Sequence, residues 1–195
     1  SPMGGIAART GALRSAAQFY QPGKIVAELD GPLALTSPGI SAQFDWQAMQ
    51  ASVRAAAAGM ERGSLDGRNI TVDIDGIRLT QKLALRADRM TAHVRRNGGD
   101  LDVAAYADGL QSNLAEGLTV TTLAFEATLA GQADLLNVPG ERRVKSGRLT
   151  LHRAAIQWSE TSSLELSGTL EIGPDGRLSG ELQLAISNPE GFPEI

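Results

Sequence analysis

Residues 163–187 read SLELSGTLEIGPDGRLSGELQLAIS, with apolar residues or glycine at every second position on both sides of Pro174-Asp175-Gly176. Alternation with a period of two predicts strands with one buried face. Pro, Asp and Gly in this order suit a three-residue hairpin loop whose glycine takes a left-handed conformation beside a bulge. This stretch therefore predicts an antiparallel β-hairpin.

The register of this hairpin follows from the length of its loop. A three-residue loop places Ile172 opposite Leu178 and Gly168 opposite Leu182, which keeps the apolar residues on one face. A loop one residue shorter or longer would set Ile172 opposite Arg177 and mix the faces. Because each glycine faces a leucine, we expect free space above the glycines. The candidate ligand-binding residues on this face are Leu166, Gly168, Leu170, Ile172, Leu178, Gly180, Leu182 and Leu184.

Similar alternation recurs along most of the chain, apolar on one face and polar on the other, which is typical of antiparallel sheets. Over residues 47–60 a strand competes with an alanine-rich helix, and we favour the strand. The predicted fold class is mainly β, a long curved antiparallel sheet or β-sandwich-like half-barrel of about ten strands with one or two short helices. The other predicted strands are 24–30, 33–37, 40–46, 69–80, 83–96, 101–109, 118–129 and 147–158.

Two further turns predict registers. A two-residue turn at Gly98-Gly99 pairs Arg95 with Asp102 and Val94 with Val103, so opposite charges and apolar residues both match. The same register pairs Arg89 with Asp108, and a Pro38-Gly39 turn pairs Leu35 with Ala42 and Leu33 with Phe44.

One early stretch has a helical period instead. Apolar residues of 6–20 fall on one helical face, and Pro22-Gly23 ends the run. The predicted organisation is an N-terminal helical segment, residues 1–23, followed by a single antiparallel β domain, residues 24–195. Residues 111–117 and 131–146 are predicted loops, and the second holds the basic cluster Arg142, Arg143 and Lys145.

Composition and motifs argue against several classes of function. The 195 residues carry a net charge of -4, with no cysteine and two histidines, so we expect no nucleic-acid partner, no metal and no cofactor. No nucleotide-binding or hydrolase motif occurs. His93 and His152 fit ordinary strand positions, and Asp73-Ile74-Asp75 reads as part of a strand. We therefore expect no enzymatic activity.

Membrane-spanning segments are not expected, because no apolar run approaches the roughly eighteen residues that a membrane helix needs. The first residues lack the charged segment and apolar run that are typical of a secretory leader, so we expect none within them. The start Ser1-Pro2-Met3 looks like a cloning remnant, so a removed membrane anchor stays an open alternative.

Several short segments, in order, are similar to a known family. They are FYQPGKIVAELDGP at 19–32, FDW at 44–46, QASV at 50–53, LTL at 149–151, IQW at 156–158, LELSGTL at 164–170 and GRLSG at 176–180. This order resembles an uncharacterised family of alphaproteobacterial cell-envelope proteins, the domain of unknown function 2125. The resemblance implies a periplasmic location and a chain that is a fragment of a longer protein. Its motifs are structural, so no catalytic residues carry over.

The sequence thus leads to two main hypotheses. The first is a non-enzymatic periplasmic protein that binds or shields a lipid-like apolar ligand on a curved sheet. The second is a structural or protein-interaction module of the envelope, whose exposed edge strands recruit a protein partner and which takes no small ligand. A third, a hydrolase or lyase, would need Asp and His residues to converge in one pocket.

Overall fold

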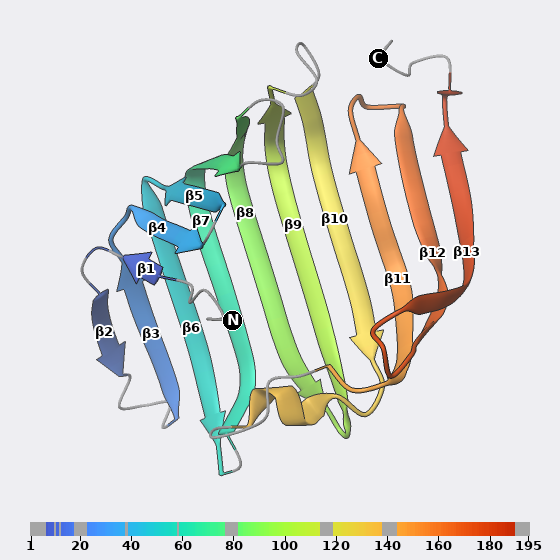
Figure 1. The fold of residues 1–195 in the computed structure, drawn as a ribbon, viewed down its shortest axis with the longest axis horizontal. Helices are drawn as coiled ribbons and strands as arrows, with labels where there is room; N and C mark the ends of the chain where they lie inside the picture. The colour runs from blue at the N-terminus through green and yellow to red at the C-terminus, as the bar shows by residue number, and fades with distance from the viewer. Residues whose placement is uncertain are drawn as a thin grey trace.

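The computed structural model of the protein describes residues 7–9, 11, 13–17, 23–37, 39–57, 59–76, 82–113, 119–137 and 144–189. In this part of the chain, thirteen strands form one antiparallel sheet (Figure 1). The elements are β1 (Ala7–Arg9), β2 (Leu13–Ala17), β3 (Lys24–Leu29), β4 (Leu33–Ser37), β5 (Ile40–Asp45), β6 (Ala48–Ala56), β7 (Gly59–Gly76), β8 (Leu83–Asn97), β9 (Asp100–Ser112), β10 (Thr119–Leu129), the 3₁₀-helix η1 (Ala133–Leu136), β11 (Gly147–Gln157), β12 (Ser163–Ile172) and β13 (Leu178–Ser187).

Strand β7 is the branch point of the sheet. Along one edge it pairs with β8. Along the other edge its first half pairs with β6 and its second half with β5. Strands β3 and β2 continue outward from β6, and β4 and β1 continue from β5, whereas β8 to β13 follow in chain order. The sheet is therefore open, with β13 as one edge.

A crease crosses the central strands of the sheet. The ladder pairs residues on both sides of Asn69, Asp88 and Gly109 but skips these three positions on β7, β8 and β9. Asn69 and Gly109 have positive φ angles of 49° and 63°. A side chain on Gly109 would also collide with the Asp88 carboxylate. Glycine suits this point of β9 because it adopts the positive φ readily and leaves room for the Asp88 side chain.

The strands change side-chain phase at the crease. A Cβ atom on Gly67 would lie 2.7 Å from Cδ1 of Ile70, so positions 67 and 70 face the same side. In an uninterrupted strand they would face opposite sides. On β8, Met90 and Ala87 lie opposite these two residues and share that side. The apolar residues consequently stay on one side of the sheet through the bend.

Trp46 supports the crease where it reaches the shorter strands. Its indole N–H donates a 2.8 Å hydrogen bond to the carbonyl oxygen of Leu29. A Cβ atom on Gly31 would lie 3.2 Å from the Trp46 ring, so glycine leaves room for it. The ring thus connects the break between β5 and β6 to the break between β3 and β4.

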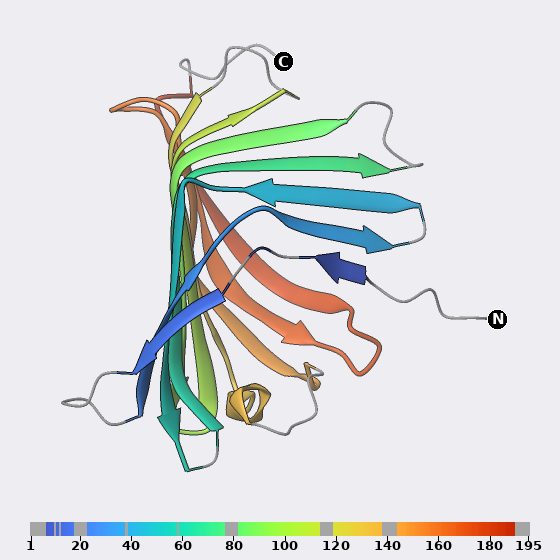
Figure 2. The same ribbon diagram turned by 90° about the vertical axis from the view of Figure 1, so that its left-hand side faces the viewer.

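Seen from its side, the sheet forms a trough (Figure 2). Strands β4 and β5 and the parts of β7 and β8 beyond the crease project to the side on which η1 lies, and the turn between β12 and β13 slopes the same way. Arg96 shares a face of β8 with Val94 and donates to Asn137, directly after η1. The concave side is therefore the apolar one, which we call the apolar face; its reverse is the polar face.

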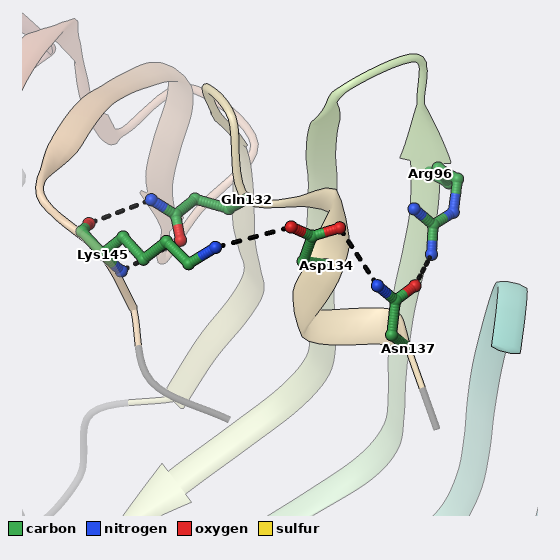
Figure 3. Close-up of polar contacts among 5 residues, drawn as sticks. All are labelled: Arg96, Gln132, Asp134, Asn137 and Lys145. Atoms are coloured by element: carbon green, nitrogen blue, oxygen red, sulfur yellow. Dashed lines mark hydrogen bonds and ion pairs between the residues drawn. The ribbon is translucent and has the colours of Figure 1, made fainter. Parts of the chain in front are cut away.

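Polar contacts hold η1 over one end of the apolar face (Figure 3). Arg96 donates to Asn137 over 2.8 Å, and Asn137 donates to Asp134 over 3.0 Å. The buried Gln132 side chain accepts from the backbone N–H of Lys145 and donates to its carbonyl oxygen, at 3.0 and 2.9 Å. Both ends of the Gln132 amide are thus satisfied, and the cover is fixed to the segment before β11.

The predicted fold class is confirmed, a mainly β protein with a curved antiparallel sheet. The predicted hairpin registers are confirmed as well, with Arg95 opposite Asp102, Gly168 opposite Leu182 and Leu35 opposite Ala42. The ambiguous stretch 47–60 forms β6 and the start of β7. Residues 77–80 of a predicted strand, residues 114–117 of a predicted loop, and Arg142 and Arg143 of the basic cluster lie outside the described residues.

The predicted helix over residues 6–20 is wrong for the residues that the structure describes. They form β1, which pairs with β4, and β2, which pairs with β3. The helical segment 1–23 is therefore replaced, in its described part, by two more strands of the sheet. Pairing with the open edges of β3 and β4 supplies backbone hydrogen bonds that outweigh the helix propensity of alanine.

The Gly98-Gly99 turn provides a stability test. Of the two glycines in this turn, only Gly98 has a positive φ, of 62°, and nothing lies within 4 Å of a Cβ atom built on either one. We expect Gly98→Ala to lower the free energy of unfolding by roughly 1–2 kcal/mol, because left-handed backbone is costly for alanine. Gly99→Ala is the matched control and should leave stability almost unchanged. Equal stability losses in urea denaturation would contradict this account of the turn.

Candidate functional site

The apolar face gathers the predicted ligand-binding residues of β12 and β13. Pairing places Leu166 opposite Leu184, Leu170 opposite Gly180 and Ile172 opposite Leu178, on one side of the sheet. The same rows continue into the interior strands, where Leu166 faces Ala154 and Leu170 faces Leu149. The eight residues thus form the distal part of a larger apolar surface.

Large apolar side chains of this face are exposed. Among the described residues, ten large hydrophobic side chains are exposed, and pairing and phase place nine of them on the apolar face. On β13, Leu178 is 59% exposed and Leu182 45% exposed. Exposed apolar side chains gathered on one face of a sheet are typical of contact surfaces for a ligand or partner. The nine are Ile25, Ile40, Leu65, Met90, Ile156, Leu178, Leu182, Leu184 and Ile186.

The backbone at Gly168 and Gly180 leaves no room for a side chain. A side chain on Gly168 would collide with the carbonyl oxygen of Glu181, and one on Gly180 with that of Thr169. Both glycines have φ near 150°, at 149° and 147°, in a region that side chains rarely allow. Their role is to let β12 and β13 bend. Enlarging either glycine therefore cannot distinguish a ligand groove from a packed core.

The polar face carries a hydrogen-bonded chain that joins four strands. Arg95 Nε donates to Asp102 over 2.9 Å, and the Thr128 hydroxyl donates to Asp102 over 2.8 Å. His152 Nε2 lies 2.8 Å from Thr128 Oγ1. Because the Thr128 proton points to Asp102, the His152 ring acts as the donor to Thr128. The sequence predicts the Arg95–Asp102 pair but not the rest of the chain, because a register shift in β11 brings His152 to it.

This order of groups differs from that of a hydrolytic triad. In a triad the histidine lies between the carboxylate and the hydroxyl and accepts the hydroxyl proton. Here the hydroxyl of Thr128 lies between Asp102 and His152, and its proton is held by the carboxylate. The hydrogen bonds therefore connect side chains of four neighbouring strands. They leave no base that could accept the hydroxyl proton of Thr128.

The protonation of Asp102 is biased by this chain. Burial opposes its ionisation, but hydrogen bonds from Thr128, Arg95 and Asn97 outweigh that effect and hold the pKa of Asp102 below its ordinary value. On the neighbouring row, burial and a hydrogen bond to Glu126 raise the pKa of Tyr106. The Asp102 carboxylate is consequently charged near neutral pH.

A cavity of about 560 Å³ lies along the polar face and includes this chain. It extends from β3 to β11, and both histidines line it. Elsewhere, Asp73 forms an ion pair with Lys82 at 3.8 Å and lies with Asp75 in β7, as predicted. In the described residues no three His, Cys, Asp or Glu side chains gather as a metal site would require. The residues with polar or charged side chains that line the 560 Å³ cavity are Lys24, Ser52, Arg54, Arg62, Ser64, His93, Arg95, Asp102, Glu126, Thr128 and His152.

Together these features define an open, antiparallel sheet protein with a concave apolar face and a polar face that holds a cavity. The chain belongs to a family of uncharacterised proteins conserved in bacteria, DUF2125, whose family model matches residues 1–192. The predicted family is thereby confirmed. Comparison with curated proteins and with solved structures gives no match. Across the described residues, no helix has the length and apolar character needed to cross a membrane.

The Asp102 chain predicts a pH-dependent contribution to stability. The carboxyl has a lowered pKa in the folded state, so its contribution is present above the ordinary value of 3.8 and is lost as pH falls through the folded value. We expect Asp102→Asn to cost roughly 1 kcal/mol at pH 7, since Arg95 is largely exposed and water screens it.

Denaturant unfolding at pH 7 and near pH 2 checks this effect. The gap between wild type and Asp102→Asn should close at the lower pH. Asp108→Asn, an exposed carboxylate on the same face of β9, is the control. A gap that stays constant with pH would show that the hydrogen bonds to Asp102 do not favour its charged form.

Proposed function

We propose that this protein is a non-enzymatic component of the bacterial envelope, located in the periplasm, that binds or shields a lipid-like apolar ligand on its apolar face. The observation that carries the proposal is the set of nine exposed large apolar side chains on one concave surface. Burying such side chains is favourable by roughly 1.5–3 kcal/mol for each one that passes fully from water to an apolar contact. An aliphatic chain supplies that contact and has no polar groups that need hydrogen-bond partners.

The shape of the sheet supports an elongated ligand. The exposed residues extend from Ile25 on β3 through Leu65 and Met90 to Ile156 and the whole of β13. Three of the six buried hydrophobic residues on this face of the strands are alanines, Ala87, Ala107 and Ala127, so parts of the trough floor carry only small side chains. A surface of this kind follows an extended apolar molecule rather than enclosing a compact one.

Binding of an uncharged apolar dye tests this function. We expect N-phenyl-1-naphthylamine to give a saturable fluorescence increase with wild type and to lose it with the double variant Leu182→Gln and Leu184→Gln. Both side chains are about half exposed, so their replacement should change stability little. The matched control is Glu181→Gln with Gln183→Asn, on the other face of the same strand. Absence of dye binding by wild type would overturn the proposal.

A second candidate function is favoured by the edge strand β13. All ten of its residues are exposed, and it pairs only with β12 in the described structure. A long exposed edge with an apolar side is a template for strand pairing with another protein chain. On this alternative the envelope protein serves as a structural or protein-interaction module.

Light scattering of the purified protein tests pairing between two copies. If β13 pairs in this way, wild type should be a dimer, and Gln183→Lys with Ser187→Lys should shift it to a monomer, because edge lysines oppose strand pairing. Both lysines lie away from the apolar face, so dye binding should not change. A monomeric wild type would reject self-pairing through β13.

A further inference from the structure

Four basic residues lie in one row on the polar face. Lys24 of β3 is directly opposite Arg54 of β6, Arg54 is opposite Arg62 of β7, and Arg62 is opposite Arg95 of β8. Residues in such pairs share a face, with Cβ atoms about 5 Å apart. Like charges directly opposite one another destabilise a sheet. Repulsion within the row therefore lowers the stability of the folded chain. The cluster also stands out because the net charge of the chain is -4.

Carboxylates compensate this row only in part. Arg54 forms an ion pair with Glu61 at 3.3 Å, and Arg95 forms one with Asp102 at 2.9 Å. Arg62 lies between these two arginines and has no carboxylate within 4 Å among the described residues. The centre of the row thus keeps an excess of positive charge that the described carboxylates do not neutralise.

Hydrogen-bond donors lie beside the centre of this row. One step along the strands on the same face, Ser52, Ser64 and His93 form the next row. The hydroxyls of Ser52 and Ser64 are 2.8 Å apart, and one bond between them leaves one hydroxyl proton for another acceptor. The 560 Å³ cavity on this face is lined by both rows.

We propose that this row binds the phosphoryl group of an anionic ligand, with Arg62 at its centre. Guanidinium groups on three adjacent strands, with hydroxyls beside them, suit a tetrahedral group that carries up to two charges and presents several acceptor oxygens. A carboxylate is planar and singly charged, and it would leave most of these donors unused. The phosphoryl group belongs either to a small phosphorylated compound or to a phospholipid headgroup.

This site is separate from the apolar face. Val53, Gly63 and Val94 alternate with the basic residues on the same strands and point to the opposite side of the sheet. The two sites therefore use side chains on opposite faces of the sheet. The anion site does not depend on the function proposed above, and variants of β13 should leave it unchanged.

Titration with inorganic pyrophosphate, followed by ³¹P NMR, tests the site. We expect saturable binding by wild type and a dissociation constant about tenfold higher for Arg62→Gln, because a hydrogen bond between charged groups is lost. The matched control is Arg177→Gln, an exposed arginine in the turn before β13, which should bind as wild type does. Without ligand, Arg62→Gln should melt at the same temperature as wild type or higher, since repulsion in the row is relieved.

Vesicle binding separates the two sources of the phosphoryl group. Binding to phosphatidylglycerol vesicles that depends on Arg62 and is absent with phosphatidylcholine, together with weak pyrophosphate binding, would assign the site to a lipid headgroup. Pyrophosphate binding without vesicle binding would assign it to a small phosphorylated compound. Binding of neither probe, or equal binding by wild type and Arg62→Gln, would overturn the proposal.

Discussion

The constraint on which the structure depends is that neighbouring strands must change side-chain phase at the same level. Asn69, Asp88 and Gly109 lie side by side on β7, β8 and β9, and the ladder resumes in the same register beyond them. If one strand kept its alternation, its second half would turn polar residues toward the concave side. The phase change is therefore shared, and it keeps both halves of the trough apolar inside.

A consequence is a sheet with very little core of its own. Six of the ten buried hydrophobic residues are alanines, and η1 covers only one end of the apolar face. Domains normally bury an apolar sheet face beneath a second layer. In the described residues this layer is limited to η1 and its flanking segments, so large side chains such as Leu184 stay exposed. The interior of the trough is therefore only partly covered by the described residues.

The sequence predicted features that depend on local turns and missed those that depend on distant pairing. The hairpin around Gly176 was predicted residue by residue, because a short loop and alternation fix the register together. The alternation predicts a strand that begins at residue 69, whereas β7 begins at residue 59, because the phase change at Asn69 makes one bent strand resemble two elements. The row that contains Arg62 could not be predicted, because it joins strands whose order only the folded sheet defines.

The two functions considered for β13 make different demands on its backbone. A strand partner satisfies the open N–H and C=O groups of the edge, whereas a lipid chain offers no hydrogen bonds. A lipid that wrapped around the edge would bury unsatisfied peptide groups, which is costly in an apolar environment. An apolar ligand should therefore lie on the side chains of the apolar face, from those of β13 across the interior strands, and leave the backbone edge of β13 uncovered. Leu182 and Leu184 would then form the rim of that surface, and the outer edge of β13 would stay in water or pair with protein.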